Sequence, residues 1–229
     1  IDAAANDLMS VCPEGSRARV RYDGARCRVD IVLQNPYVLS NGETAAAVGE
    51  THRMVLRMST SDDGTSGYKL SLLAERVRCI NLTLLHASKH ILKATHRRDD
   101  LRSLAQEALG QGAELMKGFA ETWASQWGLY YADKATRDNI SGAEALRRIV
   151  AQEKYRIQGL SEEATLVAVL KALDEEPGDS RAHVHNALTR AAHTARIGVG
   201  SRWADDDAEI QASELLYQPV YWLPEPEDA

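Results

Sequence analysis

The sequence predicts an α+β fold, in which an N-terminal antiparallel sheet of about four strands is packed by a helix and followed by a mostly helical C-terminal half. Two patterns support this prediction. Between residues 17 and 76, polar and apolar side chains alternate with a period of two, which is typical of strands. From Asp99 onward, apolar residues recur at spacings of three and four, which is typical of amphipathic helices. The chain has 229 residues and is 44% hydrophobic, which is enough for a folded core.

The first two strands are predicted on either side of the dipeptide Asp23-Gly24, because this pair is a strong signal for a tight hairpin turn. The segment Gln34-Asn35-Pro36-Tyr37 is predicted to break the second strand, and residues 40–50 form a polar loop. Residues 52–61 and 68–79 are the third and fourth strands, joined by a turn that contains Gly64. Together these segments give the four antiparallel strands.

Helices are predicted at both ends of this sheet region. A short helix covers the first 11 residues, and a second begins at Asn81, a good N-cap residue, runs to about residue 96 and packs on the sheet. Further helices follow over 99–127, 140–157, 161–176 and 180–198. Gly110 and Gly112 indicate a bend, a close approach of another segment, or simply tolerated glycines. The chain therefore divides into a basic strand-rich half (1–98), a helical half (99–204) and an acidic tail (205–229), or forms one continuous domain.

The charge is unevenly distributed, although the chain as a whole carries a net charge of −6. Residues 17–98 hold 14 Lys and Arg against 7 Asp and Glu, whereas residues 99–229 hold 13 basic against 23 acidic residues. The basic excess coincides with the predicted sheet. Such a surface is expected to face a polyanion, or to be an ordinary solvated face.

Arginines recur at alternate positions in the first two strands, so that each strand presents a basic row on one side. Whether the two rows share a face depends on the strand register. The candidate nucleic-acid-binding residues are Arg17, Arg19, Arg21, Arg26, Arg28, Arg53, Arg57, Lys89, Lys93, Arg97 and Arg98.

No motif of a familiar enzyme occurs in the sequence, which lacks a phosphate-binding loop, a dinucleotide fingerprint and a nucleophile elbow. His86 and His90 have the four-residue spacing of zinc-binding helices, but the intervening residues lack the catalytic glutamate. The sequence therefore predicts no catalytic residue, no cofactor and no metal site. A metal-dependent enzyme that uses these histidines or the run of three aspartates at 205–207 is the weakest alternative.

The compartment is predicted from cysteine usage and hydropathy. The three cysteines show no paired spacing, which favours reduced thiols. No apolar run approaches the ~20 residues that a membrane span requires, and the first residues lack the pattern of a signal peptide. We therefore expect a cytoplasmic protein without membrane contact.

The centre of the chain resembles the phage- and plasmid-borne family catalogued as domain of unknown function 932. The resemblance rests on the turn Ser61-Asp62-Asp63-Gly64, the stretch Arg76-Val77-Arg78-Cys79-Ile80-Asn81-Leu82-Thr83, His96 and the later Asn186-Ala187-Leu188-Thr189. In this chain Leu82 and Thr83 invert the usual order of the family, and Arg97 follows His96 where threonine is usual. The resemblance implies a mobile-element context and no defined activity.

Two functions follow from these observations. A hairpin, further strands and a helix on one sheet face are similar in topology to the core of single-strand annealing proteins of the RecT and Red-beta type. The first hypothesis is thus an accessory protein that binds single-stranded nucleic acid through its basic sheet and forms a homo-oligomer. The alternative is an oligomerising structural protein whose basic half docks on the acidic half of a neighbour, without nucleic acid.

Overall fold

The structure is a computed structural model that describes residues 2–22, 24–39, 50–61, 67–76, 82–84, 92–94, 98–198, 204–217 and 222–223. The chain divides into two compact units. We call them the sheet unit, which contains almost all described residues up to Ala120, and the helical unit, which contains the described residues from Glu121 onward. The division falls inside a long helix, α2 (Arg98–Trp127), whereas the sequence predicts a boundary at residue 98.

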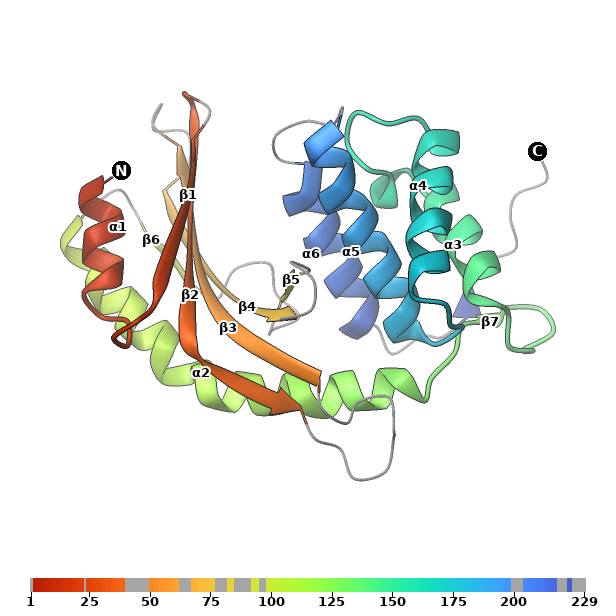
Figure 1. Cartoon of the computed structure of the whole chain (residues 1–229), viewed down its shortest axis with the longest axis horizontal. Coiled ribbons are helices and arrows are strands. Elements are labelled where there is room, and N and C mark those ends of the chain that lie inside the picture. Colours follow the sequence, from red (N-terminus) through yellow and green to blue (C-terminus); the bar gives the residue numbers. More distant parts are fainter. Residues whose placement is uncertain are drawn as a thin grey trace. The chain divides into compact units, whose positions relative to one another are not determined.

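The sheet unit is built on one sheet, drawn in Figure 1. The strands are β1 (Arg17–Tyr22), β2 (Arg26–Leu39), β3 (Glu50–Ser61), β4 (Tyr68–Arg76), β5 (Leu82–Leu84) and β6 (Leu92–Ala94). They lie in the order β1-β2-β3-β4-β5, so that β1 is an edge strand. Strands β1 to β4 pair antiparallel in sequence order, and β6 also pairs antiparallel with β4. The predicted α+β fold is confirmed, with four antiparallel strands first and mostly helices afterwards.

Two segments differ from their predicted structure. The second strand does not break at Pro36 but continues to Leu39, with a register shift against β3 between Val32 and Pro36. An irregularity of this kind accommodates a proline, which lacks a backbone donor. The helix predicted from Asn81 to residue 96 is wrong, because residues 82–84 and 92–94 are strands. Asn81 and His96 lie outside the described residues.

One face of the sheet is apolar, and α2 covers it in place of the helix predicted from Asn81. The face comprises Ile31, Leu56, Met58, Leu70 and Leu72, which are all at most 1% exposed. Alternate residues along each strand share this face because the side-chain period is two. The first helix, α1 (Asp2–Met9), which the sequence predicts, packs against β2 and buries Leu8 completely.

Gly112 marks a close approach of α2 to the sheet. A Cβ atom built at Gly112 would lie 2.6 Å from Sδ of Met54 and 3.8 Å from Cδ1 of Leu72. At Gly110 a Cβ atom would meet nothing within 4 Å. Gly112 therefore allows the close approach of another segment, which is one of the explanations that the sequence offers. Gly110 is simply a glycine that the helix tolerates.

The helical unit has its own core. Its elements are β7 (Ala132–Asp133), α3 (Gly142–Ala151), the single-turn η1 (Glu153–Tyr155), α4 (Glu162–Glu175), α5 (Arg181–Gly198), α6 (Ala204–Tyr217) and β8 (Trp222–Leu223). Ser141 caps α3 and Ser161 caps α4, in each case by accepting a hydrogen bond from a first-turn amide. Leu146, Ile149, Val169 and Val184 lie at the centre of the core.

The segment predicted as an acidic tail contributes to this core. Helix α6 packs against α5, and Ala212, Leu215 and Leu216 on α6 are buried. Beyond it, β8 pairs in parallel with β7. None of the helices in the described part of the chain is long and apolar enough to cross a bilayer.

Candidate functional site

The strand register places seven of the nine predicted arginines on one face of the sheet, opposite to the face that α2 covers. In an antiparallel pair, directly opposed residues point to the same side. Arg19 lies opposite Asp30, Asp30 opposite Arg57, and Arg57 opposite Ser71. The same alternation gives the described charged side chains of this face, which we call the basic face: Arg17, Arg19, Arg21, Arg26, Arg28, Arg53, Arg57 and Lys69, with Asp30 and Glu75. The two arginine rows of the hairpin therefore share a face.

Asp30 holds two of these arginines at the centre of the sheet. Arg57 donates to both oxygens of its carboxylate, from Nε at 2.8 Å and from Nη2 at 3.2 Å. Nε of Arg28 lies 3.2 Å from Oδ2 of the same group. All three residues are at most 4% exposed. Burial raises the pKa of Asp30, but the charges of Arg57 and Arg28 and the hydrogen bonds from Arg57 together outweigh burial and hold this pKa below its usual range.

The charge that solvent can reach lies towards β1 and the hairpin. Arg17, Arg19 and Arg26 are exposed, and Arg21 and Lys69 are half-buried. Arg17, Arg19 and Arg21 recur at every second residue of the edge strand β1, so that they are about 7 Å apart along it. Of the described residues on the basic face none is aromatic, and the exposed Tyr22 lies on the opposite side of β1.

The remaining predicted site residues are only partly described. Lys89 and Arg97 lie outside the described residues, as do the histidines at 86 and 90. Lys93 lies in β6, where it pairs with Lys69 of β4, and Arg98 is the first residue of α2. Arg53 is half-buried on β3, opposite Glu75.

Sequence reasoning missed three residues of the basic face. Lys69 alternates with Leu70 and Leu72 in the sequence, which was a usable signal that it lies on the polar side of β4. Asp30 continues the alternation of Arg26 and Arg28, but only the register brings it opposite Arg57. Glu75 continues the alternation of Lys69 and Ser71, but its ion pair with Arg19 could not have been found, because it joins two strands that are not neighbours.

The helical unit contains a polar and aromatic cluster around the start of α5. Oγ of Ser180 lies 2.7 Å from Nδ1 of His183, and the rings of His183 and His185 pack edge-on against Trp127 and Trp123. A serine beside a histidine is a combination that nucleophilic enzymes use. Here Ser180 is only 3% exposed and directly precedes α5, so the pair stabilises the start of this helix.

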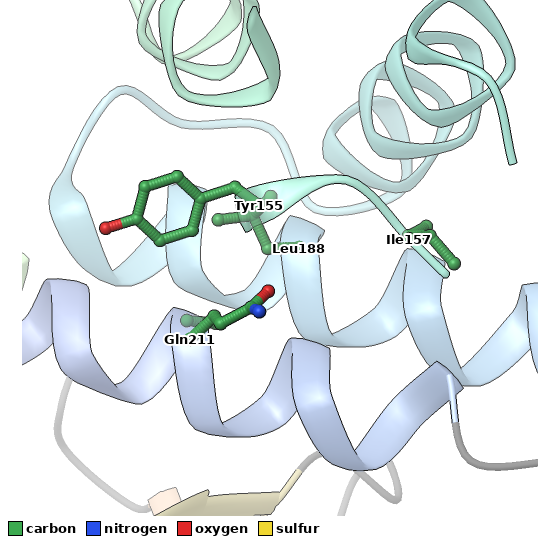
Figure 2. Close-up of a pocket in the computed structure, with 5 residues that line it drawn as sticks. Tyr155, Ile157, Leu188 and Gln211 are labelled. Carbon is green, nitrogen blue, oxygen red and sulfur yellow. The ribbon is translucent and has the colours of Figure 1, made fainter. Parts of the chain in front are cut away.

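A small cavity lies between η1, α5 and α6. Tyr155, Ile157, Leu188, Gln211 and Ala212 line it. Figure 2 shows Gln211 beneath Tyr155 and Leu188, with the hydroxyl of Tyr155 pointing away. Oε1 of Gln211 is buried and has no hydrogen-bond partner. The volume of about 10 Å³ is the space of about one water molecule, which is too little for an organic ligand.

No group of three or more His, Cys, Asp or Glu side chains within the described ranges is arranged to hold a metal ion. The run of aspartates at 205–207 begins α6, and the structure describes only its backbone. The basic face is thus the candidate site that geometry and charge support best. Comparison with protein families, with curated proteins and with solved structures finds no match for this chain.

Proposed function

We propose that this protein binds single-stranded nucleic acid through the basic face, as an accessory protein of annealing or recombination type. The observation that supports the proposal is the register, which gathers seven predicted arginines on the sheet face opposite to the one that α2 covers. Eight basic side chains and two acidic ones share this face among the described residues. Phosphate contacts supply most of the affinity of sequence-independent binding, and they need only such a concentration of positive charge.

The contacts are assigned to the arginines that solvent reaches. Arg17, Arg19, Arg21 and Arg26 would neutralise phosphates, and the half-buried Lys69 on β4 belongs to the same face. Arg28 and Arg57 are buried against Asp30, so their role in the proposal is to support the strands that carry the outer arginines. A row of cations about 7 Å apart along an extended strand fits an extended polynucleotide better than a duplex, whose phosphates follow a helical path.

The absence of aromatic side chains among the described residues of this face has a consequence for base preference. Binding that relies on stacking depends on aromatic rings, whereas contacts to phosphates carry no sequence information. The protein should therefore bind oligo-dT and oligo-dA with similar affinity, and the affinity should fall steeply with salt.

The test is a salt titration with a fluorescent single-stranded oligonucleotide, read by anisotropy. The variant Arg17→Gln/Arg21→Gln is compared with Arg102→Gln/Lys117→Gln, which removes the same charge from exposed positions of α2. Each lost phosphate contact should lower the slope of log K against log salt by about 0.7. The hairpin variant should therefore lose up to about 1.4 of slope, and the α2 variant should lose none.

Three outcomes are informative. Binding that the two double variants weaken equally would contradict the assignment to the basic face. If a duplex bound as tightly as the single strand, the proposed preference for single-stranded nucleic acid would be contradicted. No binding at low salt, with a stable multimer in light scattering, would reject the proposal in favour of the oligomerising structural protein.

A further inference from the structure

An ion pair bridges the basic face between strands that are not neighbours. Nη2 of Arg19 on β1 lies 2.6 Å from Oε1 of Glu75 on β4, although β2 and β3 lie between these strands. The sheet must be strongly curved for the two side chains to meet, and Figure 1 shows β2 and β3 as bent ribbons with α1 and α2 on their outer side. The bridge therefore runs across the inner side of the curved sheet.

The two partners of this bridge differ in their exposure to solvent. The side chain of Glu75 is 6% exposed, whereas that of Arg19 is 45% exposed. Arg19 thus remains accessible from outside while one of its donors is bound to a carboxylate below. A soluble anion can approach the same guanidinium only in competition with Glu75.

Arg53 provides a second guanidinium at the same place. It lies directly opposite Glu75 on β3, and its Nε is buried without a hydrogen-bond partner. A buried donor of this kind normally finds an acceptor. The guanidinium groups of Arg19 and Arg53 thus offer more hydrogen-bond donors around Glu75 than the Glu75 carboxylate accepts. A phosphate resembles a carboxylate in accepting paired hydrogen bonds from arginine, but it has more oxygens and can serve two guanidiniums.

We propose that Glu75 is an internal competitor of the polyanion: it occupies Arg19 in the free protein and must yield this arginine to a phosphate group. This inference rests on the proposed function. The carboxylate lowers the affinity in two ways, because it engages a contact residue and because it repels a nearby phosphate. Long polyanions, which gain several contacts at once, overcome this competition more readily than short oligonucleotides or free phosphate.

The test compares Glu75→Gln with Glu107→Gln, a control that removes the same charge from an exposed position of α2 in the sheet unit. Affinity for a single-stranded 20-mer is measured by anisotropy at two salt concentrations. Glu75→Gln should bind roughly tenfold more tightly than the control, which is the effect of a free-energy change of about 1.4 kcal/mol. In the background of Arg19→Gln, the part of this gain that comes from releasing Arg19 should disappear, and only the smaller part that comes from removing the repulsion should remain.

A second variant covers the case that Glu75→Gln does not fold. Glu75→Asp keeps the charge but withdraws the carboxylate from Arg19 by one methylene, and it should bind more tightly than the wild type. Circular dichroism verifies the fold of each variant.

The possible failures are distinguishable. If neither the wild type nor the variants bind the oligonucleotide at low salt, the proposed function fails. If the wild type binds but Glu75→Gln and Glu75→Asp match their controls, the proposed function stands and Glu75 is only a structural partner of Arg19.

Discussion

The contact between Gly112 and the sheet gives the sharpest test of the fold, because it requires α2 to lie on the apolar face, opposite to the basic face. The perturbation is Gly112→Ala, with Gly110→Ala as the matched control two residues earlier. At Gly110 a new Cβ atom meets nothing within 4 Å, so only helix propensity changes. This replacement should raise the free energy of unfolding by about 0.8–1.0 kcal/mol.

At Gly112 the same gain in propensity is opposed by a steric clash. The new Cβ atom would lie 2.6 Å from Sδ and 2.8 Å from Cε of Met54. The side chain of Met54 must move, but Sδ and Cε form the far end of a flexible side chain, so the cost should lie near the lower end of the about 1–3 kcal/mol that is typical of overpacking. We therefore expect Gly112→Ala to be less stable than Gly110→Ala by about 1 kcal/mol.

The assay is urea denaturation followed by circular dichroism, combined with amide hydrogen exchange in peptides from β3 and β4. Exchange isolates the response of the sheet unit, because protection reports local and sub-global opening. Shortening Met54 to alanine in the Gly112→Ala background should remove the clash, with a coupling of about 0.5–3 kcal/mol between the two sites. If Gly112→Ala stabilised the protein as much as Gly110→Ala, the placement of α2 on this face would be refuted.

Two further predictions concern the helical unit. Ser141→Ala and Ser161→Ala each remove an N-cap and should each lower the free energy of unfolding by about 1 kcal/mol. The control Ser125→Ala, at an exposed position within α2, should change this free energy by less than about 0.5 kcal/mol. Equal effects of all three variants would contradict the assignment of the two caps. The backbone amide of Thr136 and the side chain of Arg148 lower the pKa of Asp133 to about 2. This folded-state pKa lies below the unfolded value of about 3.9. The ionised Asp133 carboxylate therefore stabilises the folded state fully above pH ~4, and this contribution is lost as the pH falls towards 2. In Asp133→Asn, the stability of the helical unit should depend less steeply on pH in this acid range, as measured by acid unfolding followed by tryptophan fluorescence. An unchanged dependence on pH would disprove the link between the Asp133 pKa and stability.

The fold class was predictable because each half of the chain has one clear hydrophobic period. The alternation that separates Met54, Leu56 and Met58 from Arg53 and Arg57 is the alternation that the register confirms. The predicted hairpin turn likewise lies between β1 and β2, where Gly24 has a positive φ of 94°. Ser141 and Ser161 mark the starts of their helices correctly.

Other features depend on contacts that no local pattern contains. The leucines after Asn81 fit a helical stripe, but a short apolar run fits a strand equally well, and pairing with β4 decides for β6. Pro36 would break the second strand only if the strand paired regularly with β3. The register shift between Val32 and Pro36 makes the pairing irregular there, so the strand continues. The meeting of Arg19 and Glu75 follows from the curvature of four strands, which the sequence does not encode in any single segment.

The position of β1 at the edge of the sheet has a consequence for self-association. An edge strand offers unpaired backbone groups to another chain, and β1 also exposes Val20 and Tyr22. If two copies paired antiparallel through β1 with Arg19 opposite Arg19, Arg17 of one copy would lie opposite Arg21 of the other, and directly opposed like charges destabilise such pairing. The same arginines that we assign to phosphate contacts would thus protect the free protein from edge-to-edge aggregation.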